Sequence, residues 1–239
     1  MKNIIYFGYD LFADCLEYLI SNPDINILKI YSCPSDGVFD FYDRVKQIAE
    51  KNNIPFTIQK IDAKELEFQF EQNGCDLAFS AGYAYRIPVE AVPSFRGVNL
   101  HPALLPQGRG PWPFPCIILK ELDKSGVTAH KIAEKFDTGE ILLQASFAVP
   151  DNESYRELEK KSQSAALSVT KKLMSDFENY WNASKPQGKG EYWKEPSDLE
   201  RTVFRDTPED LRDRIIRAFT KEYVIFSDEE KNKGDKLCH

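Results

Sequence analysis

The first hundred residues alternate between short apolar runs and stretches whose apolar positions recur at helical spacing. Buried parallel strands are apolar on both faces and surface helices on one, so the two patterns predict strands and helices in turn. The predicted strands cover residues 3–7, 25–32, 54–59, 77–81 and 97–101. The predicted helices cover residues 10–21, 41–52 and 63–72, with a turn at 33–37. This alternation predicts an α/β fold with a doubly wound, mostly parallel sheet.

The pattern continues into the second half with two more apolar runs and a long helical segment. Residues 111–115 read P-W-P-F-P and are expected to be extended, with a helix following over residues 116–122. The runs at 127–133 and 141–149 are expected to be the last core strands. Asp151 and Asn152 are expected to cap a helix that continues to about Trp181.

A polar segment with glycine and proline at residues 185–190 follows this helix. Beyond it lie Tyr192, Trp193, a predicted helix over residues 208–219 and a charged tail at 227–239 that is expected to fray. The sequence therefore predicts a core over residues 1–184 and a small C-terminal extension over residues 185–239.

Composition and charge narrow the classes of partner. The chain has 239 residues, of which 42% are hydrophobic and 29% charged, which is ordinary for a globular protein. Its formal net charge is −7. Because nucleic-acid-binding proteins are more often basic, this balance disfavours a large RNA partner, although a local basic patch is compatible with it.

The cysteines and histidines argue against a disulfide framework or a metal centre. The five cysteines are scattered and lack C-x-x-C spacing, and no secretory signal opens the sequence, so we expect a reducing, cytoplasmic location. No apolar run is long enough to span a membrane. With three histidines we expect no metal site, and Gly8 is not part of a G-x-G-x-x-G fingerprint for a dinucleotide.

The most informative stretch extends from Val98 to Gly110 and reads V-N-L-H-P-A-L-L-P-Q-G-R-G. Asn99 and His101 are two residues apart, so on a strand they share one face, near the carboxyl end where open α/β sheets bind ligands. Asp137, on the loop between two later strands, can fold back to the imidazole. Taken singly, the histidine also fits a buried residue satisfied by backbone, and the aspartate fits an ordinary turn.

Three motifs in this region together resemble a known family. They are N-x-H-P-x-L-L-P-x-x-R-G from Asn99, G-V-T-x-H from Gly126 and D-T-G-x-I-L-L-Q from Asp137. In order and spacing they resemble the folate-dependent formyltransferases, which include glycinamide ribonucleotide formyltransferase, methionyl-tRNA formyltransferase and the nucleotide-sugar N-formyltransferases. The resemblance covers roughly the first 180 residues. It implies a Rossmann-like formyltransferase core and 10-formyltetrahydrofolate as co-substrate, with no metal.

The resemblance assigns the chemistry to three residues. An amine attacks the formyl carbon, negative charge develops on the formyl oxygen, and a proton must leave the amine. His101 is expected to donate to that oxygen and relay the proton. Asn99 is expected to orient the formyl oxygen, and Asp137 to orient the imidazole and raise its pKa. His130 lies on a strand that lines the site by resemblance, and it is given no role.

The resemblance also implies binding residues. The backbone of the loop after the strand at 77–81 is expected to pair with the pterin edge, an apolar segment is expected to wall the folate, and the segment after it is expected to face the amine. Arg109 would meet a phosphate there, unless it is a solvated surface arginine. The cofactor-binding set is Ala84, Tyr85, Arg86, Ile87, Leu104, Leu105 and Pro106, and the substrate-binding set is Gln107, Gly108, Arg109 and Trp112.

Among the family's acceptors we expect a nucleotide-linked amino sugar, for example dTDP-4-amino-4,6-dideoxyglucose, whose product would enter lipopolysaccharide O-antigen synthesis. The R-G-P-W-P run from Arg109 and the segment Tyr192–Tyr223 look like the sugar enzymes. A methionyl-tRNA enzyme is expected to carry a further C-terminal β-barrel and a basic surface, and a glycinamide ribonucleotide enzyme is expected to be shorter. The sequence fixes neither the sugar nor the position of its amine.

Two functions of other kinds remain open. A formyl-folate hydrolase uses a similar core to release formate, usually behind an N-terminal regulatory domain. A non-catalytic folate or nucleotide binder would share the fold but would not need the reactive side chains. The presence of Asn99, His101 and Asp137 argues against it. A homodimer is compatible with the sequence.

Overall fold

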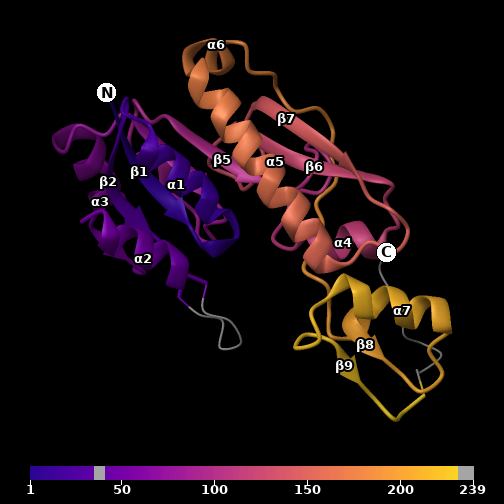
Figure 1. Ribbon diagram of the computed structural model, residues 1–239. Helices are drawn as coiled ribbons and strands as arrows, with labels where there is room; N and C mark the ends of the chain where they lie inside the picture. The colour runs from indigo at the N-terminus through magenta and orange to yellow at the C-terminus, as the bar shows by residue number, and fades with distance from the viewer. Residues whose placement is uncertain (35–40, 231–239) are drawn as a thin grey trace.

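A computed structural model describes residues 1–34 and 41–230 of the chain, and Figure 1 shows how the elements are arranged. Residues 35–37 of the predicted turn lie outside this description. So do residues 231–239 of the predicted tail, with Cys238 and His239.

A seven-stranded sheet in the order β3-β2-β1-β4-β5-β6-β7 forms the centre of the protein. The first five strands of this order pair in parallel, whereas β6 and β7 pair antiparallel, so the α/β, mostly parallel, Rossmann-like sheet expected from the sequence is confirmed. The strand order reverses between β1 and β4, which makes that point the topological switch of the sheet. The strands are β1 (Lys2–Gly8), β2 (Ile25–Tyr31), β3 (Phe56–Thr57), β4 (Leu77–Ala81), β5 (Gly97–His101), β6 (Lys124–Lys131) and β7 (Ile141–Ala148).

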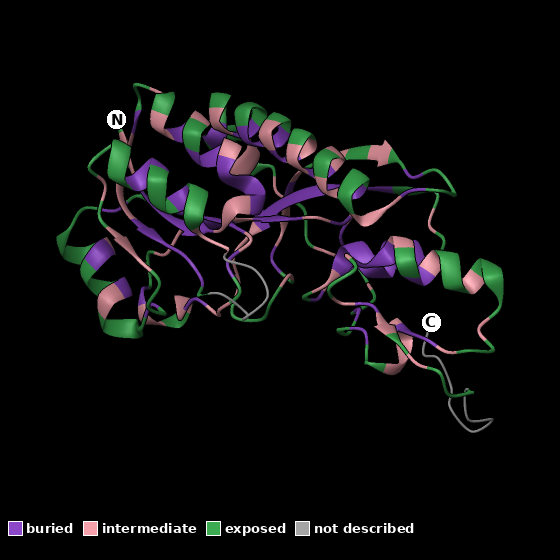
Figure 2. Cartoon of the chain, turned by 60° about the horizontal axis from the view of Figure 1, so that its bottom comes forward, coloured by how far each residue is buried: buried purple, intermediate pink, exposed green. Residues whose placement is uncertain are grey.

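Helices cover both faces of the sheet, and the alternation of side chains along β1 shows how. Ile4 and Tyr6 pack into the cluster that contains α1, α2 and α5, whereas Ile5 and Phe7 pack on the opposite face with Leu66 of α3. Figure 2 shows the buried sheet between helices whose outer faces are exposed. The helices are α1 (Ala13–Ser21), α2 (Asp43–Lys51), α3 (Ala63–Glu67), α4 (Pro113–Leu119), α5 (Tyr155–Ser175), α6 (Phe177–Asn182) and α7 (Glu209–Ala218).

Two helix starts differ from the sequence-based expectation. Helix α4 begins at Pro113, so the expectation of extended backbone was wrong for residues 113–115. A proline is accepted in the first turn of a helix, where its missing N–H has no intrahelical partner in any case. Helix α5 is capped by Ser154, whose side chain and that of Glu157 form a reciprocal capping box, rather than by Asp151 and Asn152. The predicted long helix is also interrupted at Asp176, where α6 takes over.

The C-terminal segment forms a small lobe at the end of the sheet, coloured yellow in Figure 1. It contains the parallel pair β8 (Thr202–Val203) and β9 (Ile225–Phe226), which the sequence did not predict, together with α7, which packs on α4. Backbone bridges join it to the core at Lys185, opposite Ile141, and at Tyr192, opposite Arg109. A division of the chain near residue 184 therefore stays a proposal, and any such boundary is crossed by backbone hydrogen bonds.

Within residues 1–34 and 41–230, no helix combines the length and the apolarity needed to cross a bilayer. The four cysteines in these ranges are free and buried. In the same ranges, no three His, Cys, Asp or Glu side chains are grouped so that they could hold a metal ion.

Candidate active site

A cavity of about 1130 Å³ lies beside the carboxyl ends of β1, β4 and β5, at the topological switch of the sheet. Open α/β sheets bind ligands at this place because the chain leaves neighbouring strands in opposite directions there. Its lining comes from the segments that follow β1 and β4, from β5 and β6, from the loop before α4, from the start of α5 and from the C-terminal lobe. One cavity thus extends from the sheet to the C-terminal lobe.

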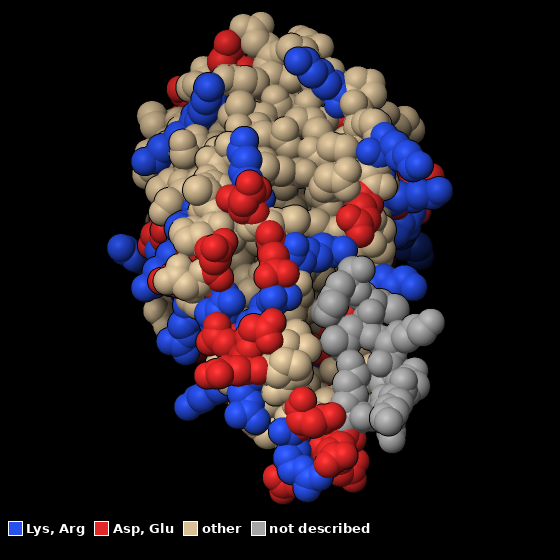
Figure 3. Space-filling model, turned by 90° about the vertical axis from the view of Figure 1, so that its right-hand side faces the viewer, with Lys and Arg blue, Asp and Glu red and all other residues tan. Residues whose placement is uncertain are grey.

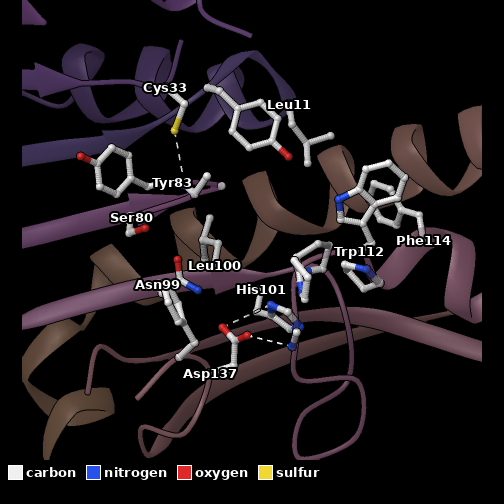
Figure 4. Close-up of a pocket in the computed structure, with 18 of the residues that line it drawn as sticks. Leu11, Cys33, Ser80, Tyr83, Asn99, Leu100, His101, Trp112, Phe114 and Asp137 are labelled. Atoms are coloured by element: carbon white, nitrogen blue, oxygen red, sulfur yellow. Dashed lines mark hydrogen bonds and ion pairs between the residues drawn. The ribbon is translucent and has the colours of Figure 1, made fainter. Parts of the chain in front are cut away.

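Asn99, His101 and Asp137 converge inside this cavity, as Figure 4 shows. Asn99 and His101 share one face of β5, and Asp137 reaches them from the loop between β6 and β7. The Oδ1 atom of Asp137 lies 3.5 Å from Nδ1 of His101 and 3.7 Å from Nε2 of His130. The structure therefore brings together the three residues that the sequence singled out, and adds a second imidazole.

The loop that carries Asp137 has an unusual backbone, and short-range sterics explain its D-T-G sequence. Asp137 has φ +55°, a left-handed conformation that aspartate tolerates better than most residues. A Cβ atom at Gly139 would overlap the carbonyl oxygen of Lys131, so only glycine fits this close approach. The second carboxylate oxygen of Asp137 accepts a hydrogen bond of 3.0 Å from the backbone N–H of Gly110.

Hydrogen-bond partners fix the protonation of His101. Its Nε2 lies 2.6 Å from the carbonyl oxygen of Gly108, which can only accept, so Nε2 carries the proton and Nδ1 of the neutral ring carries the lone pair. Burial lowers the pKa of His101 below its ordinary value and outweighs the opposing charge of Asp137. The carboxylate of Asp137 raises this pKa, as expected from the sequence, but desolvation of the ring prevails and the net shift is downward.

Asp137 is ionised in this environment. Burial raises its pKa, but attraction to a protonated imidazole at His101 or His130 and the hydrogen bond from the N–H of Gly110 favour the carboxylate, and they bring the pKa to about 2. The cavity therefore holds a fixed negative charge beside a neutral imidazole at neutral pH.

His130 orients Asn99. Its Nδ1 lies 2.8 Å from the carbonyl oxygen of Lys131 and must donate to it, so Nε2 carries a lone pair. That atom lies 3.1 Å from Nδ2 of Asn99 and accepts one of its two amide hydrogens. Since the two residues are direct partners in the β5–β6 register, their side chains lie on one face of the sheet. The second amide hydrogen and the carbonyl oxygen of Asn99 stay available to a ligand.

The predicted pterin loop lines one end of the cavity, with Ala84, Tyr85, Arg86 and Ile87 all in its wall. The ring of Tyr83 packs edge-on against Tyr85, and the N–H of Ala84 donates to Sγ of Cys33 at 3.3 Å. Figure 4 shows Cys33 and Tyr83 on the opposite side of the cavity from His101. Aromatic and aliphatic walls beside a backbone loop fit a flat, largely apolar ligand with a hydrogen-bonding edge, as the folate expectation requires.

The segment from Leu104 to Arg109 is not among the residues that line the cavity, so its assignment to the folate wall and to the substrate site stays a prediction. Its backbone folds onto β6 and β7, where the N–H of Leu105 donates to Thr128 and the Leu105 carbonyl accepts from Gln144. The guanidinium group of Arg109 is committed to Gln187 and the Gly188 carbonyl. The residues whose roles stay predictions are Leu104, Leu105, Pro106, Gln107, Gly108 and Arg109, whereas Trp112 does line the cavity.

The other end of the cavity combines aromatic rings with cations. The indole of Trp112 meets Tyr223 edge-on, with ring centroids 5.2 Å apart, and lies 6.5 Å from the ring of Phe219. Arg156 and Lys160, from the start of α5, also line the cavity, as does Arg201 of the C-terminal lobe, which pairs with Asp198. This end can hold an aromatic, anionic ligand.

Sequence reasoning missed the cavity residues that come from far along the chain and those after the first strand. Tyr9, Leu11 and Phe12 follow β1 directly, and their place at the carboxyl end of a parallel strand is a signal that could have identified them. Nothing in the local pattern around Arg201 or Tyr223 points to the cavity, because only the packing of the C-terminal lobe brings them there.

Residues 37–172 match the family profile described as Formyl transferase. Among curated relatives, the methionyl-tRNA formyltransferase of Treponema denticola is 31% identical over 193 residues, which are 78% of this chain and 59% of that protein. The methionyl-tRNA formyltransferase of Thermotoga sp. (strain RQ2) is 31% identical over 183 residues, covering 73% and 56%. The matched part of the chain thus spans less than two thirds of the length of these relatives.

Solved structures with a similar fold cover more of the chain. An N-formyltransferase from Helicobacter canadensis, in complex with folinic acid and dTDP-3-aminofucose, has a TM-score of 0.73 at 24% identity and covers 95% of this chain and 84% of that one. A 4-N formyltransferase from Francisella tularensis has a TM-score of 0.70 at 23% identity and covers 91% and 87%. At these identities the likeness establishes the fold.

Proposed function

The chain belongs to the formyl transferase family, and from that premise we propose that it transfers a formyl group from 10-formyltetrahydrofolate to the amino group of a nucleotide-linked amino sugar. One observation carries the proposal. A single cavity joins a folate-compatible end, at the loop of residues 83–87, to an aromatic and cationic end around Trp112, and Asn99, His101 and Asp137 lie in the same cavity. Two substrates would thus meet at the three reactive side chains.

In the proposed mechanism His101 is the proton acceptor. When bound, the folate co-substrate supplies the formyl carbon that the amine attacks. Nε2 of His101 donates its hydrogen to the Gly108 carbonyl, so the proton released by the amine goes to Nδ1. The charged ring is then stabilised by Asp137, whose carboxylate oxygen is 3.5 Å away. His101 would then pass this proton to the folate nitrogen, which leaves as its bond to the formyl carbon breaks. Because burial keeps the ring neutral beforehand, its base form is available at neutral pH.

Asn99 is proposed to stabilise the negative charge that develops on the formyl oxygen. His130 holds one amide hydrogen of Asn99, which leaves the second hydrogen oriented before a substrate binds. A donor fixed in advance in a buried site stabilises a developing charge without reorganisation. His130 therefore acts through Asn99, as a positioning residue.

The choice of a nucleotide-linked amino sugar rests on the end of the cavity around Trp112. The aromatic rings at this end offer an edge and a face for a base, and Arg156 and Lys160 offer charges for a diphosphate. A similarly folded protein carries folinic acid together with a dTDP-linked amino sugar, which supports the proposal at the level of the fold. A dTDP-4-amino-4,6-dideoxyglucose acceptor would connect the enzyme to lipopolysaccharide O-antigen synthesis in the cytoplasm.

Methionyl-tRNA is the second candidate acceptor, because the curated relatives quoted above are methionyl-tRNA formyltransferases at 31% identity. Charge argues against it. The net charge is −7, and on the face drawn in Figure 3 Lys and Arg are interspersed with Asp and Glu rather than gathered in one basic patch. Proteins that bind RNA use clustered cations to contact its phosphates.

The deciding experiment is mass spectrometry of acceptors after incubation with 10-formyltetrahydrofolate. The panel contains dTDP- and UDP-linked 3-amino and 4-amino sugars, glycinamide ribonucleotide and methionyl-tRNA, and a parallel assay follows release of formate. We expect one formyl group on an amino sugar and none on the other acceptors. Formylation of methionyl-tRNA alone would overturn the sugar assignment, and formate release without any formylated amine would show a hydrolase instead.

A further inference from the structure

We propose that Gln187 is a positioning residue for the reaction. Its side-chain amide holds the loop that carries Asp137 against the loop around Arg109, whose backbone contacts His101. The inference rests on the proposed function, since it assigns Gln187 a role through the His101–Asp137 pair. Gln187 belongs to the polar segment at residues 185–190 that follows the last helix of the core, and no pattern in the sequence connects it with catalysis.

The amide of Gln187 bridges two loops. Its Nε2 donates to the carbonyl oxygens of Asp137, at 2.9 Å, and of Gly139, at 2.7 Å. Its Oε1 accepts from Nε and Nη2 of Arg109, at 3.0 and 2.8 Å. Both hydrogens and both lone pairs of the amide are therefore used.

Only one orientation of this amide is compatible with its neighbours. The reversed orientation would place the amide oxygen against two carbonyl oxygens, and the NH₂ group against a guanidinium that has no lone pair to offer. The site consequently requires glutamine. Glutamate lacks the two donors that face the carbonyls, and asparagine is one methylene shorter.

These contacts converge on His101 from both sides. Arg109 lies between Gly108, whose carbonyl accepts from Nε2 of His101, and Gly110, whose N–H donates to the carboxylate of Asp137. Asp137 in turn faces Nδ1 of His101. Gln187 thus ties together the backbone of the two loops that contact the two nitrogens of the catalytic imidazole, and it keeps the left-handed turn at Asp137 in place.

Loss of this bridge should move the carboxylate away from the imidazole. The titratable groups that face His101 are Asp137, from the loop after β6, and His130, from β6 itself. Of these, only the Asp137 carboxylate raises the pKa of His101, so its displacement lowers that pKa further. A residue that merely supports folding would not produce this shift.

The test replaces Gln187 by methionine, which keeps length and charge but removes all four hydrogen bonds. Gln47→Met is the matched control, because Gln47 is exposed on α2, away from the cavity. The pKa of His101 is measured by NMR titration of the full chain, which is tractable with three histidines and assigned from the signal lost in His101→Asn. Steady-state kinetics with 10-formyltetrahydrofolate and the best amine give kcat and KM.

We expect Gln187→Met to lower the pKa of His101 and to reduce kcat by about 10²-fold, the usual effect of misplacing a catalytic group by about 1 Å. KM for the folate should stay near the wild-type value, because the pterin loop is elsewhere in the cavity. Gln47→Met should match wild type. If Gln187→Met does not fold, Gln187→Asn keeps the amide but is too short to span both loops, and the same shifts are expected.

An unchanged pKa of His101 overturns the proposal, whether or not kcat falls, because the carboxylate would then be held without the bridge. The titration needs no turnover, so it decides the role of Gln187 even if the wild-type protein formylates no amine. That last result would refute the proposed function alone.

Discussion

Nδ1 of His101 lies 3.5 Å from the carboxylate oxygen of Asp137, although the two residues come from the end of one strand and from a loop between two others. The separation is long for a hydrogen bond and short for a charge interaction. It leaves the lone pair of a buried, neutral imidazole beside a permanent negative charge. A proton received on Nδ1 would be stabilised at once, which is the property a general base needs.

His101→Ala should remove the base, and Asn99→Ala should remove the oriented amide donor. We expect turnover to fall by about 10²–10⁴-fold for the base and about 10²–10³-fold for the donor. Both are measured as formylated acceptor per unit time, with circular dichroism to show that the fold is intact. Near-normal rates in both variants would refute the assignment of this cavity as the active site.

Asp137→Asn should alter the pH dependence of kcat as well as its size. Burial lowers the pKa of His101 below its ordinary 6.5, so the wild-type rate should fall only when the pH drops below that value and the ring becomes protonated. Asparagine accepts the same left-handed backbone but carries no charge to raise the pKa of the ring. The acidic limb should therefore move to still lower pH, with a lower plateau. A limb that stays in place would show that Asp137 does not act on His101.

Gly110→Ala should destabilise the protein because the C-terminal segment lies directly on this glycine. Gly110 has φ +128°, and a Cβ there would overlap the carbonyl oxygen of Trp193. Strain of this kind costs about 1–3 kcal/mol. Gly188→Ala is the matched control, since a Cβ at Gly188 meets no atom within 4 Å. Thermal unfolding should show a lower Tm for Gly110→Ala alone, and equal values would contradict the packing described for Trp193.

Trp112→Ala should weaken binding of the acceptor while leaving the folate site intact. Its indole lies in the cavity against Tyr223, and Figure 4 shows it on the opposite side from Tyr83 of the pterin loop. Loss of one stacked or edge-on ring costs about 1 kcal/mol, which corresponds to roughly a fivefold rise in KM. Initial rates at varied acceptor and varied folate measure the two KM values separately, and Trp112→Phe should restore much of the loss. An increase confined to the folate KM would place the acceptor elsewhere.

The strands at the centre of the sheet could be predicted from the sequence because the pattern that identifies a buried strand is local. Leu77–Ala81 and Gly97–His101 were predicted with the bounds that the structure has, because buried parallel strands are short, apolar and bounded by turn residues. The juxtaposition of Asn99 and His101 follows from the two-residue period of a strand. The motif that contains Asp137 could also be recognised in the sequence, but the distance in space between Asp137 and His101 could not be predicted.

Tertiary structure decided what surrounds those residues. The direction in which the pKa of His101 shifts depends on burial of the ring, and no local sequence pattern specifies that burial. Arg109 forms hydrogen bonds with Gln187, and Tyr223 packs on Trp112. Both contacts form only because the C-terminal segment folds back across the core. Such contacts join residues far apart in the chain, and their energy comes from packing and hydrogen bonds that form only once the whole fold has assembled. The motifs and their resemblance to a known family therefore identified the reactive groups, and packing decided the protonation of His101, the contacts that hold these groups and the lining of the cavity around Trp112.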